Sequence, residues 1–150
     1  MSENLSVINK TKCKLPSLPF SNIKKDILGE KFELSIVFVT EKQSQEFNNR
    51  YRNKNNPTNI LSFCLSKTEG EILICPNIVK TQLKDFDRNL KEMIGFLVIH
   101  GMLHLKGMEH SDKMERAEKK YDQKYFYRNR CRLINDESRG GRISKGRKKS

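Results

Sequence analysis

The chain has 150 residues, the usual size of one domain, and its hydrophobic content of 35% is enough for one modest core. Thirty Lys and Arg against 18 Asp and Glu leave a formal net charge of +12, which predicts a polyanionic partner such as a nucleic acid. The longest uncharged apolar run, residues 93–103, is too short to span a bilayer, and the N-terminus lacks the pattern of a secretory signal. We therefore expect a cytoplasmic protein with no membrane partner.

Four cysteines lie far apart in the sequence, at positions 13, 64, 75 and 131, and form no CxxC pair. Zinc ribbons need such pairs, and a disulfide framework is typical of small secreted domains. We expect reduced thiols, in agreement with a cytoplasmic location.

The first part of the chain is predicted to contain two strands and a helix. A short strand fits residues 4–9, and the strand predicted at residues 34–39 is so apolar that we expect it to be covered on both faces. Between them we expect a helix that Ser21 caps and Gly29 ends.

The middle of the chain is predicted to form a helix and then a pair of strands. Thr40 and Gln43 have the spacing of a capping box, which predicts a helix that runs to about Tyr51. Residues 59–65 and 71–75 are apolar and flank a turn, as expected for two neighbouring strands.

Three helices are predicted after the strands. Pro76 suits the first turn of one helix, and a cap formed by Asp112 with Glu115 begins the last. Between them, a helix over residues 90–105 is apolar almost all round, so it belongs in the centre of the protein. These elements predict an α/β (α+β) fold, a small mixed β-sheet packed against helices, with the central apolar helix carrying a pair of histidines.

The positive charge is concentrated at the C-terminus. Nine basic and two acidic residues lie between Arg128 and Ser150, so +7 of the +12 belongs to this segment. After Ile134, Gly, Ser, Arg and Lys dominate, and the buried surface cannot offset the entropy lost on ordering. We therefore expect a folded domain over residues 1–134 and a basic, disordered tail over residues 135–150. The tail either keeps the protein soluble or lies along the phosphates of RNA.

All three histidines of the chain lie within eleven residues, at His100, His104 and His110. Two of them are four positions apart and share one face of a helix, and Gly107 offers a sharp turn that would bring the third back to them. A lone histidine pair is usually part of a helix surface or core, but two unpaired imidazoles are costly to bury. Three imidazoles with one open position indicate a catalytic zinc site, which would lower the pKa of a bound water to about 7.

The spacing of these histidines equals that of the metzincin peptidases, HExxHxxGxxH. Gly101 occupies the position of the peptidase glutamate, which is the general base of peptide hydrolysis, so its presence argues against a peptidase. Glu109 is the nearest acid and is a candidate to orient a histidine ring, or else a solvated turn residue.

A cluster of cations and amides, NRYRNKNNPT, covers residues 49–58. It is either a polar loop or a clamp for phosphate, since the planar guanidinium of arginine can bind two phosphate oxygens. Composition alone leaves both interpretations open.

Three motifs of the chain resemble the signatures of the YbeY endoribonucleases. NRYRNKNNPTNILSF (residues 49–63), GEILIC (residues 70–75) and HGMLHLKGMEH (residues 100–110) occur in the order that the family has. The resemblance implies a metal-dependent ribonuclease for single-stranded RNA that acts in ribosomal RNA maturation and contacts the small ribosomal subunit. It also implies that His100, His104 and His110 hold a zinc-like ion, and that Arg52 and His100 are catalytic.

The chain departs from the family pattern in acidic positions near these motifs. Glu71 replaces an aspartate that is common in the second signature, and Glu109 replaces the aspartate that often precedes the last histidine. Since glutamate is one methylene longer, any hydrogen bond from Glu71 or Glu109 to a histidine would be placed differently.

Three functions are compatible with these features. The first is a single-strand-specific, metal-dependent endoribonuclease that acts in 16S rRNA 3′-end maturation and ribosome quality control. A metzincin-like zinc peptidase would need a base other than Gly101 and would leave the charge of +12 unexplained. A non-catalytic RNA-binding ribosome-assembly factor would bind RNA tightly and salt-sensitively without turnover.

Overall fold

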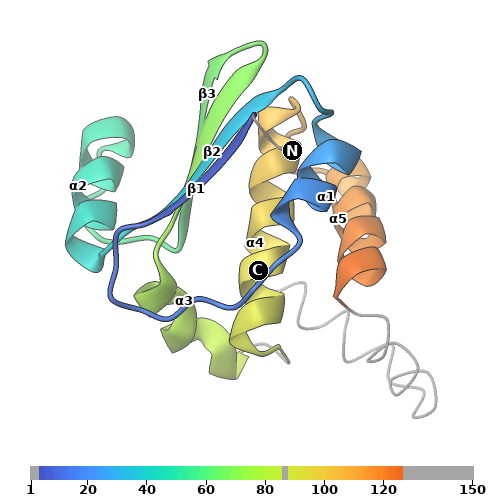
Figure 1. The fold of residues 1–150 in the computed structure, drawn as a ribbon. Coiled ribbons are helices and arrows are strands. Elements are labelled where there is room, and N and C mark those ends of the chain that lie inside the picture. The colour runs from blue at the N-terminus through green and yellow to red at the C-terminus, as the bar shows by residue number, and fades with distance from the viewer. Residues whose placement is uncertain (1–3, 86–87, 127–150) are drawn as a thin grey trace.

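The structure is a computed structural model that describes residues 4–85 and 88–126 (Figure 1). Within these residues, strands and helices alternate along the first half of the chain, and helices make up the second half. The strands are β1 (Leu5–Asn9), β2 (Glu33–Phe38), β3 (Ile60–Ser66) and β4 (Glu69–Ile74). The helices are α1 (Phe20–Ile27), α2 (Glu41–Arg52), α3 (Pro76–Gln82), the single 3-10 turn η1 (Leu83–Asp85), α4 (Leu90–Leu105) and α5 (Asp112–Tyr125).

The four strands form one mixed sheet in the order β1-β2-β4-β3. β2 lies parallel to both β1 and β4, whereas β3 pairs with β4 in the antiparallel direction. The predicted mixed sheet with helices packed against it is therefore confirmed.

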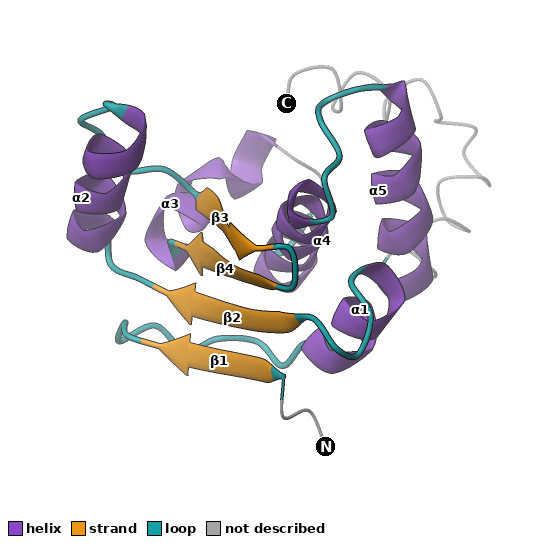
Figure 2. Ribbon diagram, turned by 90° about the horizontal axis from the view of Figure 1, so that it is seen from above, coloured by secondary structure: helices purple, strands orange, loops and turns teal. Residues whose placement is uncertain are grey.

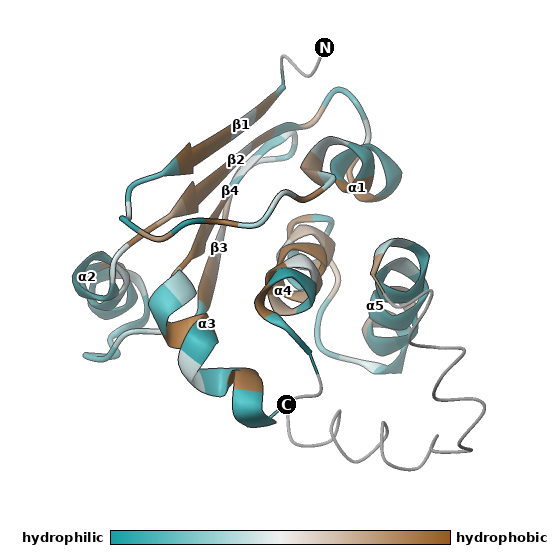
Figure 3. Ribbon diagram, turned by 60° about the horizontal axis from the view of Figure 1, so that its bottom comes forward, coloured by the Kyte–Doolittle hydropathy of each residue, from teal (hydrophilic) through white to brown (hydrophobic). Residues whose placement is uncertain are grey.

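Helices cover both faces of this sheet (Figure 2). α4 packs against one face, flanked by α1 and α5, and this face contains the larger core, in which Ile36, Ile72 and Ile94 are fully buried. α2 covers the other face, where Phe47 packs against a smaller cluster around Leu61 and Leu73. Figure 3 shows α4 as the most apolar of the helices, as expected for the helix at the centre.

Most of the predicted helix boundaries are confirmed. α4 begins and ends at the predicted residues, and Pro76 is in the first turn of α3. The capping box of Thr40 and Gln43 is present at the start of α2.

Two of the predicted helix caps are wrong. Ser21 lies inside α1, which begins after Pro19 without a side-chain cap. Ser111, not Asp112, caps α5, and its hydroxyl accepts a hydrogen bond from the Met114 amide. The N-cap position is Pro19 in α1 and Ser111 in α5, one or two residues before the predicted caps.

Some sequence predictions concern residues outside this description. The basic tail at residues 135–150 and Cys131 lie among them, so the division into domain and tail stays a prediction. The three described cysteines are free thiols, as expected. None of the helices within residues 4–85 and 88–126 is long and apolar enough to cross a membrane.

Candidate metal centre and cleft

The histidine pair is held in place by close packing of α4 on the sheet. A Cβ atom at Gly101 would lie 2.9 Å from Ser62 Oγ and 3.0 Å from Ile72 Cδ1, so only glycine lets the helix come this near to β3 and β4. Position 101 therefore points at the sheet. In this orientation a glutamate there would be directed into the core rather than toward a substrate.

A tight turn after α4 brings the third histidine to the pair. Gly107 has φ of +106°, and the amide of Met108 donates to the carbonyl of Leu103 over 3.0 Å, which is the bonding pattern of a glycine-terminated helix. His110 then lies with its ring centroid 4.6 Å from that of His104. The predicted sharp exit at Gly107 is thus confirmed.

The three rings face one another within a small volume. Each can offer one nitrogen such that all three nitrogens lie within 4.8 Å of one another. The Nε2 atoms of His100 and His104 are 3.2 Å apart, and both rings are partly buried, whereas His110 is exposed. This is the only such group of histidine, cysteine and acidic residues in the described part of the chain.

The other ring nitrogens of the pair are already engaged. His104 Nδ1 lies 3.0 Å from the carbonyl oxygen of Met108. Because a carbonyl can only accept, His104 Nδ1 carries the proton and Nε2 carries a lone pair. His100 Nδ1 lies 2.5 Å from the carboxylate of Glu118, which is buried on α5, so Nδ1 is the nitrogen that shares a proton with the carboxylate and Nε2 is the nitrogen that can bind a cation.

The arrangement suits a divalent cation. The Nε2 atoms of His100 and His104 face each other at 3.2 Å, which suits a shared proton when one of them is protonated and a shared metal ion when both are deprotonated. Tetrahedral zinc with bonds of 2.0–2.1 Å separates its nitrogen ligands by about 3.3 Å. Burial, together with the neighbouring ring of His100, holds the pKa of His104 below its ordinary value, which favours the neutral form that binds metal. His100, His104 and His110 therefore fit a zinc-like ion.

Glu118 is the acid that orients a histidine, and sequence reasoning missed it. The sequence predicted Glu109 or Glu71 as the acid that orients a histidine ring. Glu109 is exposed, and its carboxylate forms no ion pair with a histidine among the described residues. Glu71 lies on the sheet face opposite α4, because its neighbour Ile72 faces Gly101. The spacing of α5 contains a signal for this role: Glu118 follows Met114 by one helical turn, so it is an acid on the buried face of the helix, where it needs a partner.

Arg52 is not brought next to the histidines. It is the last residue of α2, exposed, on the helix that covers the other face of the sheet. After Asn53, whose backbone is left-handed with φ of 58°, the chain returns through a polar loop to Asn59 at the edge of the histidine cleft. The segment at residues 49–58 thus contains both a helix end and a polar loop.

The histidines open onto a cleft of about 840 Å³, a size typical of a ligand site. His100 and His110 line it, together with the ring of Phe96 one helical turn before His100. On another wall, the amide of Asn59 donates to Gln82 Oε1 over 3.0 Å. The cleft therefore combines a potential metal site with an aromatic ring and amide groups.

A buried ion pair supports the Phe96 wall of the cleft. The guanidinium of Arg88 makes two hydrogen bonds to the carboxylate of Asp122, of 3.0 and 2.8 Å, and both side chains are less than a tenth exposed. Arg88 also lies over the Phe96 ring, 4.6 Å from its centroid. Since Asp122 is one turn after Glu118, the inner face of α5 fixes both Phe96 and His100.

Comparisons with known proteins agree on one family. The family model described as Endoribonuclease YbeY matches residues 9–129. An Endoribonuclease YbeY of Staphylococcus carnosus (strain TM300) is 34% identical over 94 residues, and that of Staphylococcus aureus (strain JH9) is 31% identical over 96 residues. These matches cover 55% of this chain, and 61% and 62% of the relatives, so the chain spans less than two thirds of their length.

A solved structure shares the fold. The solution structure of a protein from Thermotoga maritima aligns with a TM-score of 0.60 at 24% identity, over 91% of this chain and 98% of that chain. The family model extends over most of the chain and includes the three histidines and Arg52. The chain therefore belongs to the Endoribonuclease YbeY family.

Proposed function

We propose that this protein is a metal-dependent endoribonuclease that cleaves phosphodiester bonds in single-stranded RNA, with zinc as its metal. The observation that carries the proposal is the group of three histidines beside the cleft, in which Glu118 and the Met108 carbonyl contact Nδ1 of two rings and direct their Nε2 atoms toward each other. The two staphylococcal relatives are named endoribonucleases, which supports the reaction class. The substrate in the cell is ribosomal RNA of the small subunit, in 16S 3′-end maturation and ribosome quality control, and the location is the cytoplasm.

His100, His104 and His110 would hold the ion, and each residue around them has a separate task. When bound, zinc supplies a Lewis acid for a phosphoryl oxygen and a water of lowered pKa. Glu118 keeps the proton of His100 on Nδ1 and fixes the ring plane, and the Met108 carbonyl does the same for His104. The ring of Phe96 offers a surface on which a base can stack, and Lys84 is the cation of the cleft for a phosphate.

Arg52 acts on the substrate from outside the cleft. Because Arg52 does not line it, we assign it to a phosphate next to the scissile one, which it would bind with its planar guanidinium. This contact positions the RNA strand and contributes equally to the binding of substrate and of the transition state. The polar loop between Arg52 and Asn59 connects the two contact points along one strand.

Two chemical routes use the same site. Either water or the 2′-hydroxyl of the RNA attacks the phosphorus. Attack by the 2′-hydroxyl leaves a cyclic phosphate end, whereas attack by water leaves a free terminal phosphate and a hydroxyl. Mass spectrometry of the product ends therefore assigns the nucleophile.

The proposal is tested by metal analysis and cleavage in the same preparation. The full chain should contain close to one zinc per chain and cleave a labelled single-stranded RNA, and a chelator should abolish both properties until zinc is restored. A duplex of the same sequence should be cleaved far more slowly. Tight, salt-sensitive RNA binding without turnover would instead identify a non-catalytic assembly factor, and undiminished cleavage by metal-free protein would refute the metal mechanism.

A further inference from the structure

The charge of the cleft does not explain how it attracts RNA. Among its lining residues in the described part of the chain, Lys84 is the only lysine or arginine, whereas Asp85, Glu115 and Glu118 are acidic. Even with the two charges of a bound zinc ion, these groups leave the cleft near neutral, so most of the attraction of a polyanion has to come from other parts of the protein.

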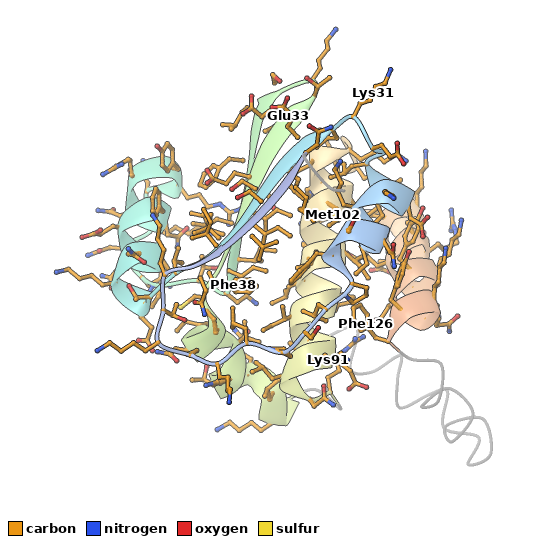
Figure 4. The ribbon with its side chains drawn as sticks, in the orientation of Figure 1. Lys31, Glu33, Phe38, Lys91, Met102 and Phe126 are labelled. Carbon is orange, nitrogen blue, oxygen red and sulfur yellow. The ribbon has the colours of Figure 1, made fainter. Side chains whose placement is uncertain are left out.

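The outer face of α5 is a concentration of positive charge beside the cleft. Five cations of this helix are exposed, whereas its buried residues are Met114, Glu118 and Asp122. Nitrogen-tipped side chains project outward from α5 in Figure 4. We call these five residues the α5 stripe: Lys113, Arg116, Lys119, Lys120 and Lys124.

The stripe is continuous along the helix. Lys113, Arg116, Lys120 and Lys124 follow one another at intervals of three and four residues, so they lie on one side, with Lys119 beside them. At 1.5 Å per residue, eleven residues extend about 16 Å, which accommodates several phosphates of one strand.

Packing and local charge pairing do not explain the stripe. Of the five cations, only Lys124 forms an ion pair within the described residues, with Asp26 of α1. Like charges four residues apart, as in Arg116 and Lys120, destabilise a helix. The exposed acids of α5, Asp112 and Glu115, are near its start and form no ion pairs with described residues. Most of the positive charge of the stripe is therefore not neutralised by an ion pair within the described residues and is available to an anion.

The position of the stripe connects it to the site. Its first cation, Lys113, comes three residues after His110, and the inner side of the same helix forms a wall of the cleft through Met114 and Glu118. In the sequence, α5 is followed by a segment with nine basic residues between Arg128 and Ser150. An RNA strand that is bound at the histidines and continues past the start of α5 would run along the α5 stripe.

We propose that the α5 stripe binds the phosphates of the single-stranded RNA that extends beyond the cleft, an inference that rests on the proposed function. The stripe positions long substrates and takes no part in bond cleavage. Short RNA that fills only the cleft does not reach it.

The test compares two triple variants of the full chain, kept free of divalent metal by a chelator so that the RNA remains intact. Lys113→Gln/Arg116→Gln/Lys120→Gln removes three cations of the stripe. Lys10→Gln/Lys42→Gln/Lys67→Gln removes three exposed cations from elsewhere and serves as the matched control. Fluorescence anisotropy measures binding of a 20-residue and a 4-residue oligouridylate between 50 and 300 mM salt, and circular dichroism checks folding.

The stripe variant should bind the 20-residue RNA about 100-fold more weakly at 0.1 M salt, with the salt slope reduced by about 2, because each phosphate contact contributes about 0.7. The control variant should keep the slope, and the 4-residue RNA should bind both variants equally. An unchanged slope in the stripe variant, or equal losses in the two variants, would overturn the proposal.

Two further arms separate this inference from its alternatives. Cleavage of the 4-nucleotide RNA by zinc-loaded protein tests the proposed function alone. If the protein bound RNA along the stripe but did not cleave it, the proposed function would be wrong and the role of the stripe would stand. Vesicles containing phosphatidylglycerol test a membrane surface as the anion. If the stripe variant lost vesicle binding and kept its RNA slope, the stripe would be a lipid contact and the proposal would be wrong.

Discussion

The two faces of the sheet hold their polar side chains in different ways. On the α4 face, the His100–Glu118 contact and the Arg88–Asp122 pair are largely shielded from solvent, and they join α5 to α4 and to the loop just before α4. On the α2 face, Arg52 is exposed at a helix end, and Tyr51 beside it is 57% exposed. Under the proposed function, the difference separates candidate metal ligands that are preorganised on one face from candidate substrate contacts that can adapt on the other.

Removing a ligand on the α4 face should have the largest effect. We expect His104→Ala to lower cleavage of single-stranded RNA at least about a thousandfold, since the metal contributes several kcal/mol to the stabilisation of the transition state. The zinc content of the purified protein should fall in parallel. Lys106→Ala, an exposed change at the end of the same helix, is the control and should leave both quantities unchanged. Strong cleavage by zinc-free His104→Ala protein would contradict this assignment.

Gly101→Glu creates the peptidase motif HExxH in the sequence and tests the orientation of α4. Because position 101 points at Ser62 and Ile72, we expect an overpacked, unpaired carboxylate that destabilises the fold by about 3 kcal/mol or more. Urea unfolding measures this loss, with exposed Lys106→Glu as the control for added negative charge. Hydrolysis of casein by the Gly101→Glu protein would show that the side chain reaches the cleft and would refute the packing argument.

The contact between α5 and α4 should tune the metal without being essential. We expect Glu118→Ala to weaken zinc affinity about 10- to 100-fold, the usual effect of losing a hydrogen-bond partner of a ligating histidine. Glu118→Gln keeps an oxygen that can accept from His100 Nδ1, so its zinc affinity should lie between that of the unchanged protein and that of Glu118→Ala. Competition with a zinc-binding dye measures the affinities. Exposed Glu115→Gln is the matched control, and an equal loss in it would indicate a general charge effect instead.

Periodic and capping signals predicted most of the fold. The bounds of α4, the capping box of α2 and the turn at Gly107 depend on residues within a few positions of one another, and each is confirmed. The caps of α1 and α5 were misplaced, because several adjacent residues can cap a helix and the surrounding turn decides which one does.

The candidate site was only partly predictable, for a physical reason. The three histidines could be grouped because a helix and a glycine turn connect them within eleven residues. Glu118 comes from another helix, and only tertiary packing brings it to His100, whereas sequence proximity favours Glu109 and the family pattern favours Glu71. Phe96 also resembled a core residue in sequence, since nothing local shows that one side of α4 lines a cleft.

A substitution at Arg52 should have the smallest effect on cleavage, and it best distinguishes the role of the α2 face from that of the α4 face. We expect Arg52→Ala to slow cleavage about tenfold, the loss of one exposed charge-assisted contact to phosphate, with zinc affinity unchanged because Arg52 touches no ligand. The loss should be in KM for long RNA, since a contact outside the cleft binds substrate and transition state alike. Arg52→Lys should recover part of it, as lysine retains the charge but not the planar fork.

The neighbouring Arg50 provides the control, because it is equally exposed on the same helix but lies over the rings of Phe47 and Tyr51. Arg50→Ala should leave KM nearly unchanged, since its guanidinium is held against the protein. If Arg52→Ala instead lowered kcat as much as His104→Ala does, Arg52 would have to reach the scissile phosphate. The polar loop that joins α2 to β3 would then have to move toward the cleft when RNA binds, and the α2 face would share in the chemistry.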